Sequence, residues 1–274
     1  MNLAISNLAW KPAAEDEAVA HLLNTHGFGG VELAPTKIWP DLTKVTEDEA
    51  GAYRKFWNDR GIQVVAMQAL LFGRDDLTIF GSQEKRDEGV AYFEVVFRIA
   101  RWLGARPLVY GSPKHRRGVD GRDPRILDTA AVYFHRLGAL ARRYEVCLCI
   151  EPLPVSYPCE FLTDTREALE FVKRVDDPGF GLHVDASSLF AGHEDIEDVI
   201  EMASGSIQHF HASEPRFEPV RTDGPVPLQK YFTCLRRAGY ARWVSVEMLE
   251  PNAGGSNLEA IEATLRDVRE AVSC

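Results

Sequence analysis

The chain has 274 residues and a formal net charge of −10, which argues against a nucleic-acid backbone as its partner. No stretch approaches the roughly 18 uninterrupted apolar residues of a membrane-spanning helix. The first residues, MNLAISNLAW, lack a basic segment followed by an apolar run, so we expect no secretory signal. The 5 cysteines lack zinc-finger spacing, and we expect free thiols in a reducing cytoplasm.

Short apolar runs recur along the chain, each followed by a break rich in Gly, Pro or Asp and then by a longer amphipathic segment. We predict strands at residues 3–6, 30–33, 62–67, 107–110, 146–150, 180–184, 207–210 and 243–246. Two intervening segments, 165–175 and 257–272, show the 3.6-residue periodicity of helices. Strands that alternate with helices in this way indicate a parallel β/α architecture.

The number of predicted strand–helix repeats favours one α/β fold in particular, the (β/α)8 TIM barrel. We expect a single barrel that forms one domain over residues 1–274. A doubly wound sheet is the competing arrangement. It is disfavoured because no G-x-G-x-x-G follows the first strand and no G-x-x-x-x-G-K-[ST] occurs anywhere in the chain.

Four polar residues close four consecutive predicted strands: Glu151, Asp185, His211 and Glu247. They are separated by 34, 26 and 36 residues (185 − 151, 211 − 185 and 247 − 211), which is about one β/α unit each. Packing does not explain a charged group at the end of a buried parallel strand. Because the carboxyl-terminal strand ends of a barrel face one shared mouth, we expect the four side chains to converge.

Carboxylate oxygens and one imidazole suit a divalent metal ion. We predict one such ion, with Mn²⁺ as the first choice and Mg²⁺, Co²⁺, Fe²⁺ or Zn²⁺ as alternatives. A lone acid at a strand end more often caps a helix or forms a salt bridge in a loop. Four such residues on consecutive strands weigh against that interpretation.

Two further positions carry hypotheses about the substrate. His183 shares a strand face with Asp185, so it either orients a ligand or is a core histidine with satisfied hydrogen bonds. Lys114 lies in the basic stretch GSPKHRRG after the fourth strand. That stretch either contacts an anionic substrate or is a solvated loop.

The contexts IEP, HVDASS, HFHASEP and VSVEM resemble the xylose isomerase-like TIM barrels, in particular the sugar phosphate isomerase/epimerase branch that includes D-tagatose 3-epimerase and hydroxypyruvate isomerase. The resemblance runs over nearly the whole chain. It implies that Glu151, Asp185, His211 and Glu247 hold the metal, and that Glu151 and Glu247 form the catalytic acid/base pair.

The resemblance also implies substrate-binding positions. Arg216 falls where related epimerases place a substrate-binding arginine, and Glu160 is a candidate for a glutamate found after the first metal ligand. The chain departs from the family at Ser188, where a D-x-x-H histidine is usual. With Lys114, this departure predicts a substrate that bears a phosphate, a carboxylate or another anionic group.

The function that these features predict is an isomerase or epimerase that removes a proton next to a carbonyl group of a small sugar or polyol ketone. Three alternatives stay open: a dehydratase of the same superfamily, a nuclease similar to endonuclease IV, and a non-catalytic sugar-binding subunit. The nuclease is disfavoured because its additional metal-binding histidines are missing and the net charge is −10. We expect a small-molecule partner, neither nucleic acid nor membrane, and assembly as a homodimer or homotetramer.

Overall fold

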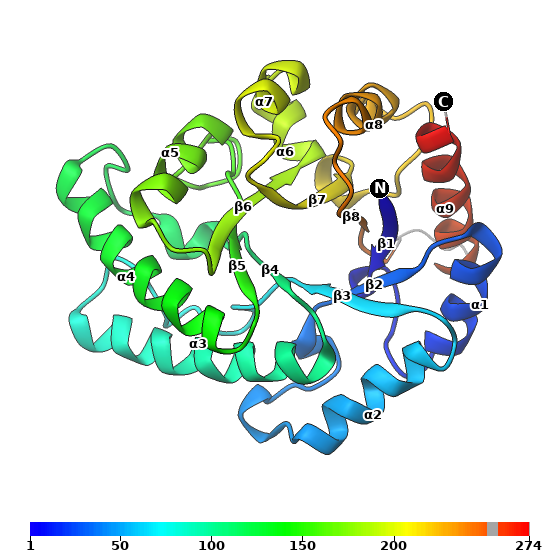
Figure 1. Ribbon diagram of the computed structural model, residues 1–274, viewed down its shortest axis with the longest axis horizontal. Coiled ribbons are helices and arrows are strands. Elements are labelled where there is room, and N and C mark those ends of the chain that lie inside the picture. Colours follow the sequence, from blue (N-terminus) through cyan, green and yellow to red (C-terminus); the bar gives the residue numbers. More distant parts are fainter. Residues whose placement is uncertain (251–256, 274) are drawn as a thin grey trace.

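A computed structural model describes residues 1–250 and 257–273. Its strands form a closed parallel barrel in the order β1 to β8, which confirms the predicted fold class (Figure 1). The strands are β1 (Asn2–Ser6), β2 (Gly30–Leu33), β3 (Gln63–Met67), β4 (Pro107–Tyr110), β5 (Cys147–Ile150), β6 (Phe180–Asp185), β7 (Ile207–Ser213) and β8 (Trp243–Glu247). Each lies where the sequence predicts a strand.

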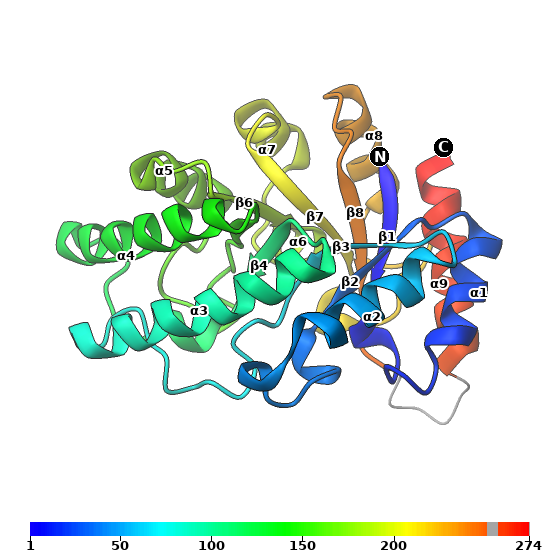
Figure 2. The same ribbon diagram turned by 60° about the horizontal axis from the view of Figure 1, so that its bottom comes forward.

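Helices surround the barrel and cover the outer face of the strands (Figures 1 and 2). They are α1 (Asp16–His26), α2 (Glu47–Asn58), α3 (Gln83–Leu103), α4 (Pro124–Arg143), α5 (Thr165–Val175), α6 (Ala186–Ala191), α7 (Ile196–Ala203), α8 (Leu228–Arg237) and α9 (Asn257–Ser273). Short 3₁₀ helices follow several strand ends, at Asn7–Ala9, Pro35–Lys37, Leu42–Lys44, Pro113–Arg116 and Pro215–Phe217. Within the described part of the chain, no helix has the length and apolar character needed to span a membrane.

Helix α5 shows how local sequence sets the boundaries of an element. The Asp164 side chain accepts a hydrogen bond from the backbone N–H of Glu167 and caps the first turn. The helix ends at Asp176, whose φ of 49° lies in the left-handed region. Between these caps the apolar side chains face the barrel, and the helix coincides with the predicted segment 165–175.

Strand register brings the polar residues of the last three strands into layers. His183 is aligned with His209, and Asp185 is aligned with His211. Strand β7 continues past the predicted end at residue 210, because Ser213 is paired with Glu247 of β8. The extension places one more polar residue at the mouth of the barrel.

Candidate metal centre and cavity

A cavity of about 300 Å³ opens at the carboxyl-terminal ends of the strands. Three of the predicted ligands, Glu151, Asp185 and Glu247, are on its wall. Apolar side chains line other parts of it, including Leu8, Val109, Leu153 and Phe217. The volume suits a small molecule held by a few polar groups.

The fourth predicted ligand, His211, is buried beside the three carboxylates and does not line the cavity. Asp185, His211 and Glu247 each offer one potential ligand atom, and these three atoms lie within 4.8 Å of one another. Atoms of Glu151, His183 and His211 satisfy the same limit. His211 belongs to both groups and therefore links the carboxylates of β6 and β8 with that of β5.

Glu151 directly follows β5, and its carboxylate lies against the chain after β4. A Cβ atom at Gly111 would lie only 2.2 Å from Oε2 of Glu151, so any larger residue there would displace this carboxylate. Burial, and then the charges of Asp185 and Glu247, raise the pKa of Glu151 well above its usual range. The folded chain thus holds this carboxyl group close to other acids.

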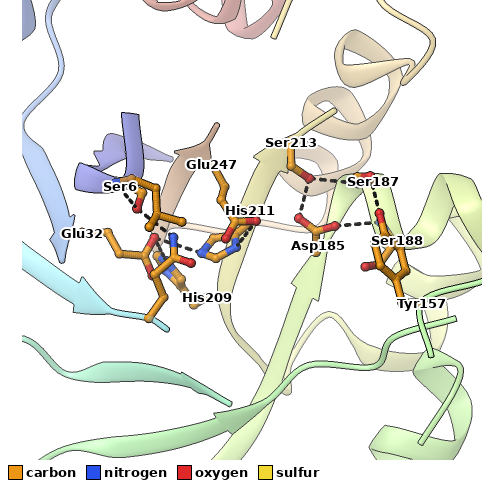
Figure 3. Close-up of polar contacts among 12 residues, drawn as sticks. Ser6, Glu32, Tyr157, Asp185, Ser187, Ser188, His209, His211, Ser213 and Glu247 are labelled. Carbon is orange, nitrogen blue, oxygen red and sulfur yellow. Dashed lines mark hydrogen bonds and ion pairs between the residues drawn. The ribbon is translucent and has the colours of Figure 1, made fainter. Parts of the chain in front are cut away.

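Asp185 closes β6 and caps helix α6. Its Oδ1 accepts a hydrogen bond from the backbone N–H of Ser188 at 2.7 Å, and its Oδ2 accepts one from the Ser213 hydroxyl. Burial, reinforced by the charge of Glu247, raises the pKa of Asp185 to about 6. The two hydrogen bonds fix the orientation of the carboxylate (Figure 3).

His211 lies between two carboxylates (Figure 3). Its Nε2 is 2.9 Å from Oε2 of Glu32, and its Nδ1 is 3.5 Å from Oε2 of Glu247. Burial lowers the pKa of His211, but the charges of Glu32 and Glu247 outweigh it and hold the pKa well above the usual value. Nδ1 makes no hydrogen bond, although it is buried.

Glu32, His209 and His211 form another group with potential ligand atoms within 4.8 Å of one another. Glu32 and His209 have no solvent-accessible surface, and neither lines the cavity. Burial raises the pKa of Glu32, but the charges of His211 and His209 outweigh it and leave the pKa well below its usual range. This deeper group is buried away from the cavity wall, with Oε2 of Glu32 2.9 Å from Nε2 of His211 and 3.4 Å from Nε2 of His209.

The cavity residues fit a divalent cation. Carboxylate oxygens of Asp185 and Glu247 lie within 4.8 Å of a His211 ring nitrogen, and so does an oxygen of Glu151. Nδ1 of His211 has no hydrogen-bond partner. A cation would offset the burial of these acids and the repulsion between them, which together raise the pKa of Glu151 and Asp185. Oxygen ligands with a single imidazole match the preferences of Mn²⁺, Mg²⁺, Co²⁺ and Fe²⁺, and also allow Zn²⁺.

The residues predicted to bind substrate are placed differently. Lys114 is paired with Asp75 at 3.1 Å, and Arg216 is paired with Glu218 on the surface. Glu160 accepts a hydrogen bond from the backbone N–H of Gly118, away from the cavity.

His183 is fully buried, with its ring centroid 4.1 Å from that of His211. None of Lys114, Arg216, Glu160 and His183 lines the cavity, so the structure does not support the predicted contacts. Burial lowers the pKa of His183 well below its usual value, and both ring nitrogens are without hydrogen-bond partners. His183 is therefore a core residue that packs against His211. It differs from the predicted core histidine in one respect, because its ring nitrogens make no hydrogen bonds.

The cavity wall includes polar residues that the sequence did not single out: Tyr157, Ser187, Ser213 and Glu214. Ser213 lies two residues after His211, so strand periodicity could have indicated it. Glu214 is only 3% exposed, and its Oε1 has no hydrogen-bond partner. Burial raises the pKa of this carboxyl group to about 7.

Arg116 joins two loops behind the cavity. Its buried guanidinium donates to the backbone carbonyls of Gly111 and Glu151, the latter at 2.9 Å, and also to that of Phe161 at 3.4 Å. The loop that holds Glu151 is thereby tied to the chain that follows β4.

The fold and the site define a parallel β/α barrel with a cluster of acids and histidines at its mouth, a class that contains many metal-assisted enzymes. The family described as "Xylose isomerase-like TIM barrel" matches residues 20–270. The chain belongs to this family, as its sequence motifs indicate.

Named relatives are isomerases and epimerases. The chain is 29% identical over 239 residues to a putative hydroxypyruvate isomerase of Streptomyces coelicolor, covering 81% of each chain. A solved structure of L-ribulose 3-epimerase superposes with a TM-score of 0.81 at 18% identity, covering 100% of this chain and 95% of that one. The IOLI protein with a bound zinc atom superposes with a TM-score of 0.78 at 20% identity, covering 100% and 98%.

Proposed function

We propose that this protein is a metal-dependent isomerase or epimerase of a small sugar, sugar derivative or polyol ketone. The observation that supports this proposal is that Glu151, Asp185 and Glu247 line one cavity, with the buried ring of His211 directly beside them. The names of the relatives, a putative hydroxypyruvate isomerase and an L-ribulose 3-epimerase among them, support the reaction class. The zinc atom of the IOLI structure supports a divalent ion, for which Mn²⁺ is our first choice.

A divalent ion held by these four residues would polarise a substrate carbonyl group and stabilise the negative charge that develops on its oxygen. Glu151 and Glu247 belong to β5 and β8, which are not neighbours in the barrel, so they approach the cavity from different directions. In our proposal, one glutamate removes the proton from the carbon next to the carbonyl group and the other returns a proton to the opposite face. Asp185 and His211 hold the ion without transferring protons.

The charge of the cavity favours an uncharged substrate. The described lining residues include four acids, Glu151, Asp185, Glu214 and Glu247, and no lysine, arginine or histidine. Apart from the proposed metal ion, a phosphate or carboxylate group on the substrate would meet these acids without a basic partner. We therefore replace the expected anionic substrate with a neutral polyhydroxylated ketone.

Free thiols support the expected cytoplasmic location. Cys147, Cys149, Cys159 and Cys234 are all buried and unpaired, as predicted, whereas Cys274 lies outside the described residues. Unpaired cysteines are typical of proteins in reducing compartments.

The test is hydrogen exchange in D₂O with a panel of ketoses and hydroxypyruvate, followed by proton NMR in the presence of Mn²⁺ and after chelation. We expect exchange at the carbon next to the carbonyl group to require both the metal and Glu247, since a Glu247→Gln side chain cannot take a proton. Exchange at the wild-type rate in this variant would exclude the assigned role. Loss of water from the substrate instead of exchange would favour the dehydratase.

A further inference from the structure

The arrangement behind the cavity contains a carboxylate to which the proposed reaction gives no role. Glu32 is on β2, on the other side of His211 from Glu247, and has no solvent-accessible surface (Figure 3). We infer that Glu32 is a positioning residue that holds the imidazole of His211 with Nδ1 directed at the metal. This inference rests on the proposed metal site.

The two ring nitrogens of His211 have different surroundings. Oε2 of Glu32 lies 2.9 Å from Nε2 of His211, a hydrogen-bond distance between residues 179 positions apart in the sequence. A carboxylate only accepts hydrogen bonds, so Nε2 of the imidazole carries a hydrogen and Nδ1 is the nitrogen that can bind a metal ion. Nδ1 is the nitrogen that lies 3.5 Å from Glu247 and has no hydrogen-bond partner.

Without Glu32, no hydrogen bond from the described residues would hold Nε2 of His211 and so define the direction of the ring. The rings of His183 and His209 pack against His211 at centroid distances of 4.1 and 5.3 Å, and these contacts are edge-to-face. Such contacts restrict the position of the ring, but they distinguish poorly between its nitrogen and carbon atoms. Turning the ring by half a revolution would exchange Nδ1 for a carbon atom and remove the ligand.

A rival interpretation makes Glu32 a metal ligand, together with His209 and His211. In that arrangement the ion would lie behind His211, where no described residue of the cavity wall contributes to the group. A catalytic ion needs a coordination position that is open to substrate. The two interpretations make different predictions for Glu32 and Asp185, which can be measured without any substrate.

The experiment is calorimetric titration of the chelator-treated full-length protein with Mn²⁺ and then with Zn²⁺. We expect Glu32→Gln, which keeps an oxygen acceptor but loses the charge, to weaken binding by roughly 10- to 100-fold and to leave one ion per chain. Asp185→Asn should weaken binding more than Glu32→Gln does. The matched control is Asp16→Asn, because Asp16 is also a buried acid and accepts hydrogen bonds from Trp10 and Tyr53 outside the cavity.

The titrations distinguish a failure of the inference about Glu32 from a failure of the proposed function. Unchanged affinity in Glu32→Gln, with wild-type binding intact, overturns the inference and leaves the proposed function standing. If Glu32→Gln abolishes binding and Asp185→Asn does not, Glu32 is a ligand, which also overturns the inference. If the wild type binds neither ion, the proposed function fails and the inference fails with it.

A second measurement decides the question if Glu32→Gln does not fold. Nitrogen-15 NMR of histidine-labelled, metal-free wild type, with the His211 signal identified by its loss in His211→Gln, reports which ring nitrogens carry hydrogen. We expect hydrogen on Nε2. An Nε2 atom without hydrogen overturns the inference.

Discussion

The Ser213 hydroxyl accepts a hydrogen bond from the backbone N–H of Ser187 at 3.0 Å and donates its own hydrogen to Oδ2 of Asp185. This direction follows because the carboxylate can only accept. The other oxygen of Asp185 is held by the N–H of Ser188. Two strands and the start of helix α6 thus orient one proposed metal ligand (Figure 3).

Ser213→Ala tests this support. We expect metal affinity to fall by about tenfold, because Asp185 loses one of the two hydrogen bonds that orient it. The control is Ser245→Ala, since Ser245 is buried on β8 and its hydroxyl has no hydrogen-bond partner. Calorimetric titration with Mn²⁺ measures both variants, and equal affinities would contradict the role given to Ser213.

Gly111→Ala should displace Glu151, because the new Cβ atom would lie 2.2 Å from its Oε2. We expect kcat/KM to fall by roughly 100-fold, since a shift of about 1 Å in a catalytic group has effects of that size. Gly51→Ala is the control, because a Cβ there meets nothing within 4 Å. A Gly111→Ala enzyme with wild-type activity would show that the position of Glu151 is unimportant.

Glu214 should make stability depend on pH. Its pKa is raised from about 4.5 to about 7, so the folded chain binds this proton more tightly than the unfolded chain. Its effect is therefore to lower the free energy of unfolding as the pH rises from about 4.5 to 7. We expect Glu214→Gln to be more stable than wild type by about 1–2 kcal/mol at pH 8, with the difference shrinking towards pH 5.

Urea unfolding at both pH values measures this effect. A variant less stable than wild type at pH 8 would contradict the expected sign. The expected gain is smaller than the full pKa shift implies, because Glu214 borders a cavity that water can enter.

Lys114→Ala tests the cationic loop. The Lys114 side chain is 62% exposed and pairs with Asp75, so we expect kcat/KM to stay within about twofold of wild type for a free ketose and for its phosphate ester. Steady-state kinetics with both substrates measures this. A selective loss of activity on the phosphate would restore the anionic substrate predicted from the sequence.

The sequence was most informative where the backbone is regular. Alternation along a strand determines which side chains point inward, and parallel pairing brings all carboxyl-terminal strand ends to one mouth. Glu151 and Asp185 could therefore be assigned to a common site without coordinates. The same rule covers Ser213, which was missed because the predicted strand ended at residue 210 instead of continuing to Ser213.

Side chains in loops could not be placed in this way. Arg216 has a φ of 61° in the left-handed region, a conformation that its sequence neighbours do not indicate. Lys114 lies in a 3₁₀ helix whose direction depends on distant packing. The contact between Glu32 and His211 could not be predicted from the sequence either, because it depends on the diameter and twist of the whole barrel.

The buried guanidinium of Arg116 also has a consequence for the redesign of this barrel. By bonding to the carbonyls of Gly111, Glu151 and Phe161, it joins the segments after β4 and β5 into one hydrogen-bonded unit. Replacing the segment that carries Arg116 would leave the buried carbonyls of Glu151 and Phe161 without this donor. Loop exchanges should therefore replace the two segments together, or alter loops that Arg116 does not reach.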